Sequence, residues 1–152
     1  MHRATNINFV VSIFLTAEAQ KRRGMTSEEY YGLGKQIIDA SIHVHKELGP
    51  GLLESVYTYA LLKEFELRLI STQSKVLIPL FYKGFDTGKI FEIDILVENE
   101  IILEIKSVDI MHPVYEAQLL TYLRLANKKL GYLINFNVPL LKNGFKRFVN
   151  NF

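Results

Sequence analysis

The sequence predicts an α/β fold with α+β layering, in which a mixed sheet of four strands is flanked by helices. The expected order of elements is helix, helix, strand, strand, strand, helix, strand. A helix between the last two strands acts as a crossover connection, which places those two strands parallel to each other. The earlier strands are expected to join the sheet in antiparallel orientation. The length of 152 residues suffices for one domain with a substantial core.

Composition excludes several classes of protein. Hydrophobic residues make up 49% of the chain and charged residues 22%, which is typical of a globular protein and argues against disorder. The net charge of +2 permits nucleic-acid binding without indicating it. The absence of cysteine excludes disulfides, thiolate metal sites and a cysteine nucleophile. No apolar run reaches the length of a transmembrane helix, so no membrane partner is expected.

The N-terminal region is expected to lie outside the fold. We predict an N-terminal extension over residues 1–24 and a single domain over residues 25–152. An apolar run and an Ala-x-Ala pattern within residues 1–19 resemble a weak signal peptide. The basic residues Lys21-Arg22-Arg23, just beyond that pattern, argue against cleavage there. A cytoplasmic location is therefore the expectation, with secretion as the minor alternative.

Two helices are predicted first. Thr26 and Glu29 fit a capping box, and apolar residues at spacings of three and four extend the helix to about Leu48. Gly49-Pro50-Gly51 ends this helix. A second helix is expected from about Leu52 to Arg68. It carries Glu54 in its first turn, where the helix dipole favours a carboxylate.

The remaining elements follow from β-rich segments and turn residues. Residues 75–82 read as a strand, and Pro79 within it indicates an edge or irregular strand. Turn-forming residues predict a turn region over 83–88. A loop over 107–113 and a helix over 114–127 lead to a nearly all-apolar strand over 129–136, and the tail 138–152 is expected to form a short surface strand or a helical turn.

The segment 91–106 predicts a hairpin with its charges on one face. Odd-numbered positions outside the turn are apolar, whereas Glu92, Asp94, Glu104 and Lys106 share the even-numbered face with Leu96 and Ile102. A turn at 98–100 places Asp94 opposite Glu104, and Glu92 opposite Lys106. Facing side chains lie roughly 5 Å apart at Cβ, which suits two carboxylates that bind one divalent cation. An amphipathic hairpin with one solvated face explains the same pattern without a cation.

Two motifs in this sequence resemble a known family. Asp94 followed by Glu104-Ile105-Lys106 is similar to the D-x(n)-E-x-K signature of PD-(D/E)XK nucleases, with Ile93 in place of the proline. Residues 51–57, GLLESVY, resemble the motif that names the GxxExxY proteins, a branch of that superfamily. Residues 44–51, 116–123 and 131–137 are also similar to that branch, so the resemblance covers about Thr26 to Val149.

The resemblance implies a metal-dependent site. Asp94, Glu104 and the backbone carbonyl of Ile105 would bind Mg²⁺ or Mn²⁺. Lys106 would orient or deprotonate the attacking water and stabilise the charge that develops on phosphorus. Glu54 would be an additional catalytic carboxylate.

Other candidate residues complete the predicted site. The resemblance implies that Gln118 is the polar helix residue that accompanies the lysine. Gln118 and Tyr122 are four residues apart, so they project from the same side of their helix. Tyr57, Tyr122, Glu92 and His45 are expected to line the pocket, although core packing accounts equally well for both tyrosines. For His45, a polar residue at a helix C-terminus is the alternative to a pocket role.

The resulting functional hypothesis is a metal-dependent nuclease or phosphodiesterase-like domain. One alternative is a non-catalytic module that binds nucleic acid or protein on the same fold. Another is a metal-dependent hydrolase of a small phosphorylated molecule. The sequence leaves open the choice between DNA and RNA, and also the oligomeric state.

Overall fold

The computed structural model describes residues 23–152. Its elements are, in chain order, α2 (Ser27–Leu48), α3 (Glu54–Leu67), β1 (Thr72–Tyr82), β2 (Phe85–Val97), β3 (Ile101–Lys106), α4 (Pro113–Leu125), β4 (Leu130–Asn135), the 3₁₀ turn η1 (Leu141–Gly144) and β5 (Phe145–Val149). The chain divides into two compact units between Ile37 and Ile38, and α2 contributes residues to both. The sheet and every candidate site residue belong to the second unit.

The start of α2 confirms the predicted capping box. The Thr26 backbone N–H donates to the Glu29 carboxylate at 2.7 Å, and the Glu29 backbone N–H donates to the Thr26 hydroxyl at 3.2 Å. These two bonds satisfy main-chain donors that a helix N-terminus leaves without intrahelical partners. The helix therefore begins where the sequence predicts it.

The second unit contains a mixed sheet of five strands in the order β1-β2-β3-β4-β5. β3 and β4 pair in parallel, joined by the crossover helix α4, and the other neighbouring strands pair antiparallel. The predicted fold class is thus confirmed. The fifth strand comes from the tail, which contains both the helical turn and the strand that the sequence left as alternatives. β1 is an edge strand, in keeping with Pro79.

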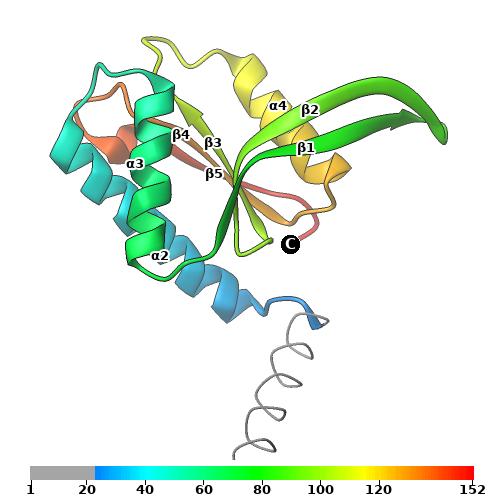
Figure 1. Cartoon of the computed structure of the whole chain (residues 1–152), viewed down its shortest axis with the longest axis horizontal. Coiled ribbons are helices and arrows are strands. Elements are labelled where there is room, and N and C mark those ends of the chain that lie inside the picture. Colours follow the sequence, from blue (N-terminus) through cyan, green and yellow to red (C-terminus); the bar gives the residue numbers. More distant parts are fainter. Residues whose placement is uncertain (1–22) are drawn as a thin grey trace, which may run out of the picture. The chain divides into compact units, whose positions relative to one another are not determined.

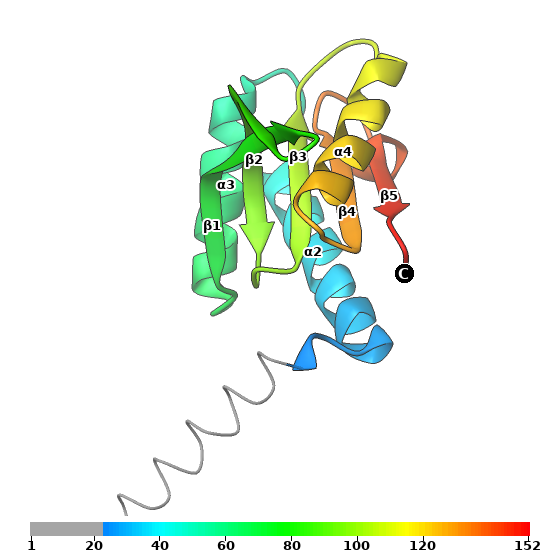
Figure 2. The same cartoon turned by 90° about the vertical axis from the view of Figure 1, so that its right-hand side faces the viewer.

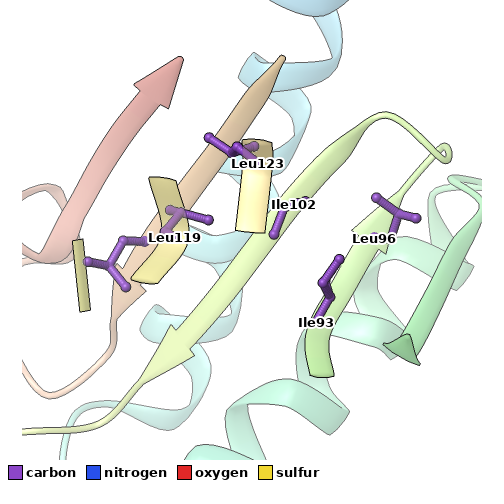
Figure 3. Close-up of a cluster of buried hydrophobic side chains, with 6 residues drawn as sticks. Ile93, Leu96, Ile102, Leu119 and Leu123 are labelled. Atoms are coloured by element: carbon purple, nitrogen blue, oxygen red, sulfur yellow. The ribbon is translucent and has the colours of Figure 1, made fainter. Parts of the chain in front are cut away.

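The α3 and α4 helices lie on opposite faces of this sheet (Figures 1 and 2). On the α4 face, buried aliphatic side chains of α4 pack against those of β2, β3 and β4 (Figure 3). The cluster consists of Leu119 and Leu123 from α4 and Ile93, Leu96, Ile102 and Leu133 from the strands. Gly131 of β4 permits the close approach of α4, because a Cβ there would lie 3.0 Å from Leu119 Cδ1 and 3.2 Å from the Ile102 carbonyl oxygen. On the other face, α3 buries Tyr57, Leu61 and Phe65.

The strict alternation predicted along β2 fails at Ile93. Ile93 belongs to the same buried cluster as Leu96 and Ile102, although the alternation assigns it to the opposite face. The pairing of β1 with β2 is irregular at the next residue. Ser74 pairs with Ile95 and Val76 with Ile93, whereas Lys75 and Asp94 between them do not pair. Lys75 has a φ of 53°, which interrupts the regular extended backbone there.

The hairpin of β1 and β2 extends well beyond the other strands (Figure 1). The predicted turn region reduces to Lys83-Gly84, and Asp86, Thr87 and Gly88 lie within β2. These turn-forming residues are accommodated because the Thr87 hydroxyl donates to the Leu80 carbonyl at 2.6 Å, next to a register shift between Leu80 and Phe81. We call residues 77–92 the arm. Five of its large side chains are exposed to solvent: Leu77, Phe81, Tyr82, Phe85 and Ile90.

Within residues 23–152, no helix is both long enough and apolar enough to cross a membrane. The signal-peptide-like segment within residues 1–19 lies outside the described residues. The division at residue 25 and the cytoplasmic location therefore stay predictions.

Candidate active site

The candidate site forms where β2 separates from β3. The antiparallel ladder runs through Val97–Ile101 and Leu96–Ile102 and ends at Ile95–Leu103, in the predicted register. Beyond this pair, the Asp94 side chain, and not the β2 main chain, accepts the hydrogen bond from the β3 backbone. Its Oδ2 atom accepts a hydrogen bond of 2.8 Å from the Ile105 backbone N–H, and the Asp94 backbone N–H donates to Glu104 Oε1 at 3.4 Å. These bonds bring the Asp94 and Glu104 carboxyl groups together.

Burial and mutual repulsion determine the charge state of this carboxyl pair. Glu104 lies on β3, between β2 and β4, and is only 6% exposed. Burial, followed by the negative charge of Asp94, raises the pKa of Glu104 to about 9. Burial also raises the pKa of Asp94, although the hydrogen bond from Ile105 opposes that shift. A side-chain hydrogen bond joins the two groups, and it raises the pKa of Glu104 while lowering that of Asp94. The metal-free pair therefore retains a proton at neutral pH.

Lys106 lies at the end of β3, beside this pair. Its positive charge lowers the pKa values of both Asp94 and Glu104. The Lys106 Nζ atom lies 4.4 Å from the centre of the Tyr115 ring on α4. The predicted pairing of Lys106 with Glu92 is wrong, because the β2–β3 ladder has already ended at Ile95. Glu92 instead lies in the arm, exposed and paired across the strands with Leu77.

The α4 helix contributes Gln118 and Tyr122. The Gln118 Nε2 atom donates to the Tyr122 hydroxyl at 2.7 Å, as expected for side chains on the same side of a helix. Burial raises the pKa of Tyr122, and so do the negative charges of Glu104 and Asp94. The Tyr122 ring stacks on Phe91 of β2, with ring centres 4.4 Å apart. Tyr122 thus lies near the carboxyl pair, and Gln118 is connected to it through the Tyr122 hydroxyl.

Glu54 approaches from the start of α3. It is exposed, and its negative charge is among the causes that raise the pKa of Asp94. Glu54 does not complete a three-carboxylate cluster, however. Among residues 23–152, no group of three or more histidine, cysteine, aspartate or glutamate side chains is arranged to hold a metal ion.

Tyr57 and His45 make contacts of their own outside the Asp94–Glu104 pair, and their pocket-lining role stays a prediction. The Tyr57 ring is fully buried and stacks on Phe136, with ring centres 4.5 Å apart. The His45 Nε2 atom lies 2.7 Å from the carbonyl oxygen of Val138. His45 also lines a separate open cavity of ≈ 390 Å³ together with Lys46 and residues 139–142, and none of the other candidate residues borders it.

Four residues near the site escaped the sequence analysis: Phe91, Ser107, Tyr115 and Asn135. Tyr115 is three and seven residues before Gln118 and Tyr122, so helical spacing alone places it on their side of α4. Asn135 is a polar residue at the end of an otherwise apolar strand, and it is only 3% exposed. Such a buried amide needs hydrogen-bond partners, and Asn135 finds them in the backbone that follows β3. The sequence contains no comparable signal for Ser107 or Phe91.

The donor set of the site suits a hard divalent cation. Asp94 and Glu104 supply carboxylate oxygens, and the bonds from the Asp94 and Ile105 backbone N–H groups keep the two carboxyl groups close to each other. Mg²⁺ retains several waters and is usually bound through one or two protein carboxylates. A third carboxylate is therefore not required, and a cation would neutralise the mutual repulsion of the partly buried Asp94 and the buried Glu104.

Comparison with known proteins agrees with this geometry. The family model described as PD-(D/E)XK nuclease superfamily matches residues 31–148, which is well over half of the chain. Neither a curated protein nor a solved structure matches the sequence. The matched segment contains all the elements that bring Asp94, Glu104 and Lys106 together. The chain belongs to the PD-(D/E)XK nuclease superfamily.

Proposed function

We propose that this domain is a nuclease that hydrolyses phosphodiester bonds of nucleic acid with the help of Mg²⁺ or Mn²⁺. The observation that carries the proposal is the close pair formed by the partly buried Asp94 and the buried Glu104, with the Lys106 ammonium beside it. Members of this superfamily generally use divalent metal ions. The GLLESVY motif at the start of α3 supports placing the chain in the GxxExxY branch.

The metal would be held by the Asp94 and Glu104 carboxylates and by the Ile105 carbonyl. When bound, it would polarise a phosphoryl oxygen and lower the pKa of a coordinated water. For both carboxylates to bind the cation in their charged form, Glu104 must release its proton, which burial and the negative charge of Asp94 favour keeping. Metal affinity should therefore rise with pH.

The surroundings of Lys106 support a charge-stabilising role. The positive charge of its ammonium group lowers the pKa values of both Asp94 and Glu104. Its Nζ atom contacts the Tyr115 ring of α4. In hydrolysis, water adds to phosphorus and the bond to the leaving oxygen breaks, so negative charge accumulates on the phosphoryl oxygens. Lys106 would donate hydrogen bonds to those oxygens or orient the water.

The arm supports nucleic acid as the substrate. It exposes Phe81, Tyr82 and Phe85, and the same strand continues from the arm to Asp94. Exposed aromatic rings are suited to stacking on the bases of single strands, which contributes roughly 1–3 kcal/mol per base. The net charge of only +2 favours this mode over extensive phosphate contacts with a duplex.

Cleavage assays test the proposal directly. Labelled single-stranded and duplex DNA and RNA would be incubated with Mg²⁺ or Mn²⁺, with the wild type, Asp94→Asn, Lys106→Met and the exposed control Lys129→Met compared. We expect cleavage by the wild type and the control, and its loss in the other two variants. Equal cleavage by all four proteins would refute the assignment of the site.

A non-catalytic module on the same fold is the second candidate. The observation in its favour is that the described residues contain no cluster of three carboxylates, so Glu54 does not form a three-carboxylate metal site with Asp94 and Glu104. Titration with Mn²⁺ separates the two functions. Binding that disappears in Asp94→Asn supports the nuclease, whereas nucleic-acid binding without any Mn²⁺ binding supports the module.

A further inference from the structure

The segment that precedes α3 determines where Glu54 lies. Gly49 and Gly51 have φ angles of 70° and 93°, which favour glycine and turn the chain sharply after α2. Leu53 is the N-cap residue of α3, and it makes no side-chain capping bond. Glu54, the first helical residue, therefore depends on contacts other than a side-chain cap for its position.

Tyr57 supplies two of these contacts. Its hydroxyl donates to the Gly49 carbonyl at 2.5 Å and accepts from the Leu52 backbone N–H at 3.1 Å. One hydroxyl thus bonds both sides of the turn that leads into Glu54. The Tyr57 ring is itself fixed, because it stacks on Phe136, whose backbone N–H donates to the Lys106 carbonyl at 2.9 Å.

Ser107 supplies a third contact, from the opposite direction. Its hydroxyl donates to the Leu52 carbonyl at 2.5 Å, and Ser107 directly follows Lys106 in the chain. The next residue, Val108, is held by the buried Asn135 amide, through bonds of 3.1 Å to its N–H and 3.0 Å to its carbonyl. Leu52 is therefore connected to α3 through Tyr57 and to the end of β3 through Ser107.

We infer that Tyr57 and Ser107 are positioning residues that set the place of Glu54 relative to the Asp94–Glu104 pair and Lys106. The inference rests on the proposed function. It gives each motif residue within 51–57 a role: Gly51 turns the chain, Glu54 would act in the site, and the Tyr57 hydroxyl bonds the segment that leads into Glu54. Ser107 acts from outside this motif.

Hydroxyl-deletion variants test this role with minimal disturbance of packing. Tyr57→Phe keeps the stacked ring and removes both bonds to the turn, and Ser107→Ala removes the bond to Leu52. We expect each to lower kcat by about tenfold, since small misplacements of catalytic groups are costly. Ser107→Thr, which retains a hydroxyl, should recover most of the loss. Matched controls are Tyr59→Phe, an exposed tyrosine on the same helix, and Ser74→Ala.

A double-mutant cycle with Glu54→Gln distinguishes positioning from simple stabilisation. If Tyr57 and Ser107 act through Glu54, their variants should cause no further loss of kcat in the Glu54→Gln background. Undiminished losses in that background would overturn the inference, and so would wild-type kcat in both Tyr57→Phe and Ser107→Ala. Thermal melting of each variant identifies any loss due to unfolding.

The same cycle, measured as the dissociation constant for Mn²⁺, remains informative without cleavage. The negative charge of Glu54 acts on Asp94, so Glu54→Gln should weaken Mn²⁺ binding several-fold, and Tyr57→Phe should do so only when Glu54 is present. A wild type that binds Mn²⁺ but cleaves none of the probes refutes the proposed reaction alone. A wild type that neither binds nor cleaves refutes both, and unchanged Mn²⁺ affinity and kcat in Glu54→Gln refute the inference alone.

Discussion

The Lys106 ammonium lies 4.4 Å from the centre of the Tyr115 ring. A flexible lysine side chain gains a preferred direction from such a contact, because the negative face of the ring attracts the cation. The contact directs Lys106 toward α4, which also carries Gln118 and Tyr122. A helix residue that the sequence motif does not contain thus orients the lysine of that motif.

Replacement of Tyr115 by leucine should weaken catalysis while the carboxyl pair remains intact. Cation–π contacts of partly exposed groups contribute roughly 0.5–1 kcal/mol, so we expect kcat to fall by about two- to fivefold with little change in Mn²⁺ affinity. Steady-state kinetics and Mn²⁺ titration measure the two quantities, and Tyr59→Leu is the control. A kcat equal to that of the wild type would show that Tyr115 does not orient Lys106.

Glu104→Gln should stabilise the metal-free protein, and the gain should increase with pH. The folded-state pKa of about 9 for Glu104 lies above the ordinary glutamate value of 4.5, so stability falls as pH rises from about 4.5 to about 9, and below that range the folded state carries no such penalty. Glutamine removes the penalty because it carries no titrating proton. Urea unfolding in EDTA at pH 5 and pH 8 measures the effect. The same gain in free energy of unfolding at both values would contradict the predicted pH dependence.

Pairing near the central turn was predictable from the sequence, whereas pairing farther out was not. Hydrophobic periodicity is a local property, and a tight turn at residues 98–100 fixes the register of its first neighbours, so Ile95–Leu103 follows from both. Glu92 and Lys106 do not pair, because β2 stays with β1 in the arm after leaving β3. That choice between two neighbouring strands depends on the whole sheet.

The roles of aromatic residues show the same limit. Helical spacing placed Gln118 and Tyr122 together because both lie on one element. Helical spacing also places Tyr57 on the apolar side of α3. It does not identify the hydrogen-bond partners of the Tyr57 hydroxyl, Gly49 and Leu52, because they lie outside the helix. The interior position of Tyr57 depends on Phe136, far away in the sequence.

Two substitutions of Asp94 should separate its structural role from metal binding. Both Asp94→Ala and Asp94→Asn remove the charge and should abolish tight Mn²⁺ binding. Asparagine retains an oxygen that accepts from the Ile105 N–H, whereas alanine leaves this buried donor without a partner. We therefore expect Asp94→Asn to be more stable than Asp94→Ala by about 1–3 kcal/mol in the free energy of unfolding. Equal stabilities would mean that the hydrogen bond contributes nothing.

The arm should contribute to nucleic-acid binding independently of the metal. Removal of an exposed ring, in Tyr82→Ala or Phe85→Ala, should weaken the binding of single-stranded oligonucleotides by about five- to a hundredfold, as expected for the loss of one stacked base. Mn²⁺ affinity should not change. Fluorescence anisotropy over a series of salt concentrations measures binding, with Tyr59→Ala as control. A loss restricted to duplex probes, or no loss, would contradict the stacking role.

The hydrogen bond from Ile105 to Asp94 also makes one amide of the backbone a spectroscopic probe. A main-chain N–H that donates to a carboxylate changes its proton chemical shift when the charge on that carboxylate changes. Most amides in β3 donate to other main-chain groups and lack this sensitivity. The Ile105 resonance in a ¹H–¹⁵N spectrum should therefore report proton loss, cation binding and substrate arrival at the site, without any label on the site itself.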